Sequence, residues 1–213
     1  MLFLGQNNIK IIMQSIDDKI VNSLSKCGRG VAFSAARFAH YGNADAVRKA
    51  IARLCNKNTV IRLAKGIYYY PKIDKDFGLG VIYPTADDIA TAIAKRDGAK
   101  IVPTGVYALN RLGLSTQVPT NFVYLTDGKT RKILLENGRY ITFVHTALKN
   151  LQFKNYIAML ITFALKSIGN ENVTEQQIAH IQNIIKQEGK EKIMQDIAKM
   201  PDWIKKIITK TND

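Results

Sequence analysis

The stretch VIRLAKGIYYYP, residues 60–71, alternates apolar and basic residues, turns at a Lys-Gly pair, and ends in three tyrosines and a proline. Its short period and its β-branched and aromatic side chains predict two strands joined at Lys65 and Gly66. Because proline has no amide hydrogen to give to a strand ladder, Pro71 marks the end of the second strand. The stretch therefore predicts a two-stranded ribbon with a charged tip, whose meaning depends on the residues before it.

Three helices are predicted before the ribbon, over residues 15–26, 34–42 and 43–58. Each begins at a residue whose side-chain oxygen can accept a hydrogen bond from a free amide of the first turn: Ser15, Ser34 and Asn43. Residues 31–33 predict a short extended link. The order helix, helix, tight turn, helix and hairpin predicts a winged helix-turn-helix, in which the third helix enters the major groove of DNA and the ribbon is the wing.

The third helix has two chemically different faces. Spacings of three and four residues predict an inward apolar face, which consists of Val47, Ala50, Ile51 and Leu54. Arg48, Lys49 and Arg53 fall on the outward face, and Arg62 and Lys65 on the wing can reach a neighbouring phosphate. These cations could also form a solvated helix surface, but the order of elements favours contact with DNA.

The positive charge of the chain is concentrated around this ribbon. The 213 residues contain 31 Lys and Arg against 17 Asp and Glu, a formal net charge of +14. Residues 43–72 hold seven of the bases and a single acid, whereas residues 151–213 hold nine bases and seven acids. A localised excess of this kind favours a polyanionic partner, with nucleic acid ahead of a membrane surface.

The second half of the chain predicts a small α+β domain followed by helices. Helices are expected from Thr85 and over residues 104–112, and strands over residues 120–126, 131–136 and 140–146. The Asp-Gly and Asn-Gly pairs between these strands predict two hairpins. The predicted organisation is an arm at 1–14, the winged helix-turn-helix at 15–72, a linker at 73–82, an α+β domain at 83–150 and helices at 151–213. The fold class is α+β.

Several other functions lack support in the sequence. No run approaches the roughly 20 apolar residues of a membrane span, the N-terminus does not resemble a signal peptide, and either Met1 or Met13 could be the start. Two cysteines and three scattered histidines predict neither a disulfide framework nor a metal site. The acidic pairs at 17–18 and 87–88 fall in first helical turns, where negative charge suits the helix dipole. We therefore expect a cytoplasmic protein that is not an enzyme, with no catalytic residues, metal or cofactor.

Two segments carry a resemblance to a known family. SAARFAHYGNADAVRKAIARLCNKNTVIRLAKGIYYYPK, residues 34–72, resembles the N-terminal winged helix of AbiEi-type antitoxins, the antitoxin half of bacterial type IV toxin–antitoxin pairs. VPTGVYALNRLGLSTQVPTNFVYLTDGKTRKI, residues 102–133, is similar to the segment that follows in the same proteins. The resemblance covers about residues 14–146 and is weak or absent over the C-terminal helices.

The resemblance implies that the winged helix represses its own operon and that the following region carries the antitoxin activity. The DNA-facing positions that it implies are Ser34, Arg37, Asn43, Arg48, Lys49, Arg53 and Lys65. It assigns residues 105–114, including Tyr107, Asn110 and Arg111, to the antitoxin domain. Arg131 and Lys132 could extend the basic surface toward nucleic acid or an acidic toxin, or could be edge-strand charges that prevent aggregation; both interpretations stay open.

The leading prediction is an antitoxin that binds its own promoter and counteracts a nucleotidyltransferase-like toxin, without a necessary stable contact between the two proteins. A homodimer is possible. The alternative is a stand-alone winged-helix regulator whose second domain senses a ligand or dimerises. An RNA-modifying enzyme ranks last because the sequence supplies no acid–base or metal constellation.

Overall fold

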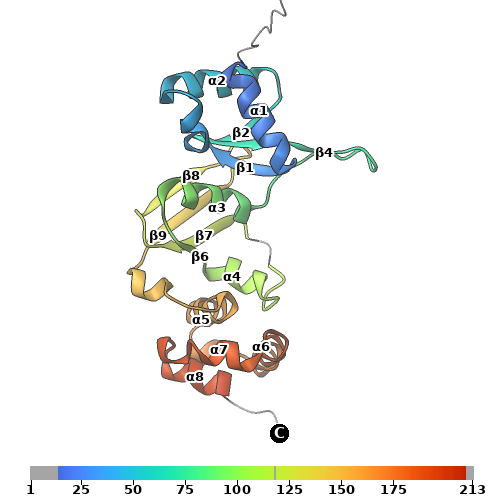
Figure 1. Ribbon diagram of the computed structural model, residues 1–213. Helices are drawn as coiled ribbons and strands as arrows, with labels where there is room; N and C mark the ends of the chain where they lie inside the picture. Colours follow the sequence, from blue (N-terminus) through green and yellow to red (C-terminus); the bar gives the residue numbers. More distant parts are fainter. Residues whose placement is uncertain (1–13, 118, 210–213) are drawn as a thin grey trace, which may run out of the picture. The chain divides into compact units, whose positions relative to one another are not determined.

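The computed structural model describes residues 14–117 and 119–209, so the predicted arm and the choice between Met1 and Met13 lie outside the described residues apart from residue 14. The chain divides into two compact units, Met1–Pro84 and Thr85–Asp213, here called unit 1 and unit 2. Both combine helices with antiparallel strands (Figure 1). The prediction of an α+β protein is confirmed.

Unit 1 consists of helices packed on a three-stranded sheet. Its elements are α1 (Ile16–Cys27), β1 (Val31–Ser34), η1 (Ala35–Tyr41), α2 (Ala44–Asn56), β2 (Ile61–Ala64), β3 (Ile67–Tyr70), β4 (Lys72–Asp74) and β5 (Gly80–Ile82). The sheet has the strand order β1-β3-β2, and both pairings are antiparallel. The predicted ribbon is therefore the β2–β3 hairpin, and the link predicted at 31–33 forms a third strand because it pairs with β3 along its whole length.

The helix starts of unit 1 agree with the predictions at two of three positions. The Ser15 side chain accepts from the Asp18 amide, and the Asn43 side chain accepts from the Ala46 amide. The segment after Ser34 is instead a 3₁₀ helix interrupted at Phe38, and Ser34 makes no side-chain cap. The predicted linker is also different, because residues 72–82 form a two-stranded antiparallel hairpin, β4–β5.

The core of unit 1 joins α1, α2, η1 and the sheet. It consists of ten buried residues: Ile20, Leu24, Phe33, Phe38, Val47, Ala50, Ile51, Leu54, Val60 and Tyr70. The predicted inward face of α2 is confirmed, since all four of its apolar residues are among them. Tyr69 points to the opposite side of β3, and its hydroxyl donates to the Ile82 carbonyl, so this phenol packs on the following hairpin.

Unit 2 begins with α3 (Ala86–Asp97), β6 (Ile101–Pro103), α4 (Gly105–Arg111), β7 (Asn121–Thr126), β8 (Arg131–Leu134) and β9 (Tyr140–His145). Its sheet has the order β6-β7-β9-β8, in which β7 and β9 are parallel. The Asn-Gly hairpin between β8 and β9 is confirmed. The prediction of an Asp-Gly hairpin between β7 and β8 is wrong, because β9 lies between these two strands. Residues 127–130 therefore lead from β7 across β9 to β8, a distance of about 10 Å.

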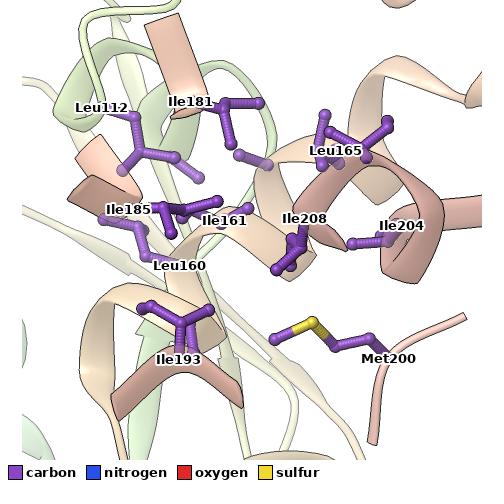
Figure 2. Packing of buried hydrophobic residues seen from close by; sticks show 14 residues of the cluster. Leu112, Leu160, Ile161, Leu165, Ile181, Ile185, Ile193, Met200, Ile204 and Ile208 are labelled. Carbon is purple, nitrogen blue, oxygen red and sulfur yellow. The ribbon is translucent and has the colours of Figure 1, made fainter. Parts of the chain in front are cut away.

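Helices complete unit 2: η2 (Leu148–Leu151), α5 (Tyr156–Ile168), η3 (Asn170–Asn172), α6 (Glu175–Glu188), α7 (Lys190–Met194), η4 (Ile197–Lys199) and α8 (Asp202–Thr209). Leu112, which follows α4, shares one core with the helices α5 to α8 (Figure 2). No helix among residues 14–117 and 119–209 is long and apolar enough to cross a bilayer.

Candidate nucleic-acid interface and a polar cavity

The outward face of α2 presents two exposed cations. The side chains of Arg48 and Lys49 are 65% and 71% exposed, and both contact Asp45, at 3.4 and 3.0 Å. The opposite face of this helix is buried in the core, so these side chains cannot turn inward. Because an exposed ion pair contributes about 0–1 kcal/mol, both cations can exchange Asp45 for a phosphate or a base at little cost.

Arg53 lies on the same helix but is held by a partner from α1. Its Nε and Nη2 atoms donate to the two carboxylate oxygens of Asp17, at 3.0 and 2.6 Å. This hydrogen-bonded arginine lowers the pKa of Asp17 below its ordinary value. The pair ties α1 to α2 across 36 residues of sequence, a contact that the sequence analysis missed. Both donor atoms of this bidentate arginine that the Asp17 carboxylate can reach are therefore engaged within unit 1.

Three further predicted contact residues have structural roles. Ser34 is buried at 9% exposure, and Asn43 uses its side-chain oxygen to cap α2. The Arg37 guanidinium donates to the Cys27 sulfur at 2.7 Å, which joins η1 to the end of α1. Of these three side chains, only Arg37 combines positive charge with exposure.

The β2–β3 hairpin carries its two cations, Arg62 and Lys65, outward. Arg62 on β2 and Lys65 in the turn are exposed, while Leu63 and Ala64 between them are buried. Gly66 follows Lys65 with φ 75°, in the left-handed region that a residue with a side chain rarely adopts. The register shifts between Arg62 and Ala64, which places the irregularity of the hairpin beside its charged tip.

A second polar surface of unit 1 lies along α1. A hollow of about 640 Å³ is lined by polar and basic side chains and one phenol: Gln14, Lys19, Asn22, Ser23, Ser25, Lys26 and Tyr41. Lys19 and Lys26 are seven residues apart, so they lie on one side of the helix, two turns apart. This surface is not among the sequence-based predictions, although the spacing of the two lysines could have indicated it.

In unit 2, two of the predicted basic residues are engaged within the protein. Arg131 pairs with Asp97 and lies over the Phe143 ring, at 5.3 Å from its centroid. Burial lowers the pKa of Arg131. Lys132 lies 3.9 Å from the centroid of the Tyr140 ring. The two ring contacts join β8 to its neighbour β9, and the pair with Asp97 joins β8 to the end of α3.

Other predicted residues of unit 2 gather around a carboxylate. Asp87, in the first turn of α3, accepts from the Tyr124 hydroxyl at 2.5 Å and from the Arg111 guanidinium at 2.5 Å. Burial, followed by the negative charge and hydrogen bonding of Asp87, raises the pKa of Tyr107 to about 12. Asn110 does not join this cluster, because its amide donates to backbone carbonyls of the loop that follows α4.

An open cavity of about 400 Å³ lies beside this cluster. It is lined by acids, hydroxyls, one arginine and a small apolar floor: Thr85, Asp87, Asp88, Thr91, Ile101, Pro103, Arg111, Tyr124 and Tyr156. From the sequence, Asp87 is expected only to stabilise the start of a helix, and no local pattern indicates Tyr124 or Tyr156. Among the described residues, no group of three or more His, Cys, Asp or Glu could hold a metal ion.

Comparison with known proteins places the chain in a family. Residues 19–193 match the family model DUF6088, a family of unknown function. No curated protein matches the chain. Among solved structures, the chain is similar to the RV2827C protein from Mycobacterium tuberculosis, with 15% identity and a TM-score of 0.46 over 91% of this chain and 74% of that one.

Proposed function

The chain belongs to the DUF6088 family, and we propose that it binds duplex DNA through unit 1 and is the antitoxin and autorepressor of a bacterial type IV toxin–antitoxin pair. One observation carries the DNA-binding proposal. Helix α2 buries one face in the core and presents Arg48 and Lys49 at 65% and 71% exposure on the other. A helix that reads the major groove needs this division of faces.

The arrangement of unit 1 supports its interpretation as a winged helix-turn-helix. The order α1, β1, η1, α2, β2 and β3 gives a compact helical group followed by an antiparallel hairpin with a charged tip. In this interpretation α2 is the recognition helix and the β2–β3 hairpin is the wing. The 3₁₀ helix η1 takes the position of the second helix.

The exposed cations then divide into three groups. Arg48 and Lys49 are placed to enter the major groove, where each can contact a base edge or a bordering phosphate, and Arg62 and Lys65 are placed to contact a flanking phosphate. Lys19 and Lys26 on α1 would meet the backbone on another side. Ser34 and Asn43 are left out as direct contacts, because the first is buried and the second caps α2. Most contacts in such interfaces go to phosphates, so affinity should depend strongly on salt.

The test compares three proteins on the DNA upstream of the chain's own gene: wild type, Arg48→Ala/Lys49→Ala, and a control, Lys190→Ala/Lys192→Ala, which removes the same charge from unit 2. The α2 variant should bind at least about tenfold more weakly, and its log–log salt slope should be shallower by about 1.8 if both side chains neutralise phosphates. The control should match wild type. An α2 variant with wild-type affinity and slope would remove α2 from the interface.

The antitoxin part of the proposal is supported by the resemblance of residues 102–133 to AbiEi-type antitoxins. Co-expression with the product of the adjacent gene should rescue growth from that product. Because the proposed activity belongs to unit 2, the Arg48→Ala/Lys49→Ala variant should rescue as well as wild type when expressed from an unrelated promoter. Absence of rescue by wild type would leave only the DNA-binding proposal.

The cavity beside Asp87 favours a second candidate function, a regulator that senses a small molecule. Its volume of about 400 Å³ falls within the range of ligand pockets. This candidate predicts that Thr91→Trp, which would fill the cavity from an exposed position on α3, changes repression in cells while purified protein binds DNA as wild type does. Unchanged repression would contradict it.

A further inference from the structure

Three lysines of unit 2 surround one small cavity, here called the lysine cavity. Its volume is about 190 Å³, and its lining consists of the three lysines, an amide and two phenyl rings: Lys149, Asn150, Phe153, Phe163, Lys166 and Lys199. The lysines come from η2, the last turn of α5 and η4. Residues 151–213 are nearly neutral as a whole, with nine bases and seven acids. The fold therefore gathers positive charge at one point that no local pattern of the sequence indicates.

The positive charge of the lysine cavity is balanced only in part by the protein. Lys199 pairs with Asp196 at 2.6 Å, and its ammonium group also donates to the Gln152 carbonyl. Lys149 and Lys166 are both exposed, and within the described part of the chain neither ammonium group makes an ion pair or a hydrogen bond. The cavity therefore has three positive charges against one negative charge. Like charges around one cavity favour an anion between them.

A buried carboxylate holds Lys199 at the cavity. Asp196 is 0% exposed, and it accepts hydrogen bonds of 2.8 Å from the backbone amides of Lys154 and Asn155. Asn155 is the capping residue of α5, so Asp196 is fixed relative to the helix that carries Lys166. The ammonium group of Lys199 is therefore held in place by a partner that is itself fixed.

The two phenyl rings are the apolar part of the lining and attract two of the ammonium groups. The ring centroids of Phe153 and Phe163 lie 6.3 Å apart, and Phe163 is buried in a core with Leu151. Lys166 Nζ lies 5.4 Å from the Phe163 centroid, and Lys199 Nζ lies 5.5 Å from that of Phe153. A ring face attracts a cation but has no lone pair for its N–H donors, so the Lys166 ammonium keeps its donors for a ligand.

Charge and size identify the chemistry of the ligand. A phosphate group carries about 1.5 to 2 negative charges at pH 7 and three strong acceptor oxygens, which matches three lysines better than the single charge of a carboxylate does. Lysine binds such groups as a point charge. At roughly 30 Å³ for each water of the liquid, the cavity has the volume of about six waters, which accommodates one or two phosphate groups. A whole nucleotide does not fit, since pockets for larger ligands measure about 300–1,000 Å³.

We propose that the lysine cavity binds the phosphate group of a small phosphate-bearing molecule. Lys149 and Lys166 contribute the charge that no carboxylate of the described residues neutralises, and Lys199 contributes donors from a fixed position. The inference goes beyond the proposed function. These lysines lie on η2, α5 and η4, and they belong neither to α2 and the β2–β3 hairpin nor to the lining of the cavity beside Asp87.

Calorimetric titration of the full chain with pyrophosphate at constant ionic strength tests the proposal. Wild type should bind pyrophosphate, and should bind acetate at least about tenfold more weakly. Lys149→Ala/Lys166→Ala should weaken the binding of pyrophosphate at least about tenfold, because two charge-assisted contacts are lost. Both side chains are exposed and neither makes an ion pair with a described residue, so the variant should fold. Lys190→Ala/Lys192→Ala removes the same charge from exposed positions outside the cavity and should bind as wild type does.

Amide chemical shifts locate the bound anion and identify its source. Pyrophosphate should shift the amides of residues 149–153, 163–167 and 196–199 and leave those of α1 and α2 unchanged. A nucleoside triphosphate that shifts the same amides would show that the phosphate end of a larger molecule enters the cavity. Shifts with pyrophosphate and inorganic phosphate alone would identify a free anion as the ligand.

Failure of wild type to bind any of these three phosphate compounds would overturn the proposal. Equal affinities of wild type and Lys149→Ala/Lys166→Ala for pyrophosphate would overturn it too, as would acetate that binds as tightly as pyrophosphate. The same variant should bind the upstream DNA as wild type does, which separates this result from the test of α2. A variant that keeps its affinity for pyrophosphate but loses affinity for DNA would instead assign the two lysines to a nucleic-acid surface.

Discussion

Helices α1 of unit 1 and α3 of unit 2 begin with nearly the same four residues and use them differently. The start of α1 is Ser-Ile-Asp-Asp at 15–18, and that of α3 is Thr-Ala-Asp-Asp at 85–88. In both, the first residue caps the helix and the fourth returns a hydrogen bond to the cap, a complete capping box. The third residue, Asp17 or Asp87, pairs in both with an arginine of a later helix.

The difference lies in what surrounds each pair. The Asp17–Arg53 pair sits beside the exposed cations of α2, and Arg53 is 55% exposed. Asp87 also accepts a phenol, and its pair with Arg111 lines a cavity. The same local sequence therefore positions a surface cation in unit 1 and a polar network in unit 2. Asp17 and Asp87 both place a negative charge in the first turn of a helix, where it suits the helix dipole. The residues that surround each carboxylate in the fold determine its further contacts.

The network of unit 2 should make its stability fall at high pH. An unfolded tyrosine has a pKa of about 10, whereas the pKa of Tyr107 is raised to about 12. Because the protonated phenol is favoured in the folded state, it contributes up to about 3 kcal/mol to the free energy of unfolding below pH 10. This contribution is lost as the pH rises from about 10 to about 12. Urea unfolding followed by the fluorescence of Trp203, the single tryptophan of the chain, measures unit 2 directly.

In Tyr107→Phe the free energy of unfolding should decline less steeply over this window than in wild type. Tyr83→Phe, which removes an exposed phenol from unit 1, is the control and should decline as wild type does. Equal slopes in all three proteins would mean that folding does not raise the pKa of Tyr107.

The comparison is sharpened by changing the two aspartates in the same way. Asp17→Ala and Asp87→Ala each remove one first-turn charge, so this common loss cancels between them. Each change breaks two charge-assisted hydrogen bonds of the aspartate, but Asp87→Ala also leaves the Tyr124 hydroxyl, on a side chain that is 1% exposed, without its acceptor. We expect unit 2 to lose about 1–2 kcal/mol more from Asp87→Ala than unit 1 loses from Asp17→Ala.

Hydrogen exchange resolves the two units separately and gives both values in one experiment. The amides of α1 and α2 report unit 1, and those of α5 report unit 2. Equal losses in the two units would mean that the phenol and the cavity add nothing to the role of Asp87.

Local features of this fold were predictable from the sequence, and contacts between distant residues were not. The caps at Ser15 and Asn43, the inward face of α2 and the β2–β3 hairpin depend on neighbours within about five residues, and the structure confirms them. The failed prediction of a β7–β8 hairpin concerns a strand whose partner is remote in sequence. The Asp-Gly pair at 127–128 signals a hairpin locally, yet β9 takes the place beside β7.

The candidate sites follow the same division. Arg48 and Lys49 were predicted from helical periodicity, because exposure on an amphipathic helix follows from its sequence. The partners of Arg53 and Arg111 lie 36 and 24 residues away, so no local pattern could indicate them. The β4–β5 hairpin was missed because residues 73–82 contain glycines and charges typical of a linker, and only the structure shows that they pair into two strands.

The smallest expected effect concerns the Asp17–Arg53 pair and DNA. Asp17→Asn keeps the size of the side chain but removes a negative charge beside α2 and loosens the hold on Arg53. Affinity for the upstream DNA should rise about two- to fivefold, and the log–log salt slope should steepen by up to about 0.9 if Arg53 takes up a phosphate. Asp202→Asn in unit 2, which removes the same charge from an exposed position, is the control and should leave both quantities unchanged. A weaker affinity in Asp17→Asn would instead mean that the carboxylate positions Arg53 for DNA, so that the pair would belong to the interface as a unit.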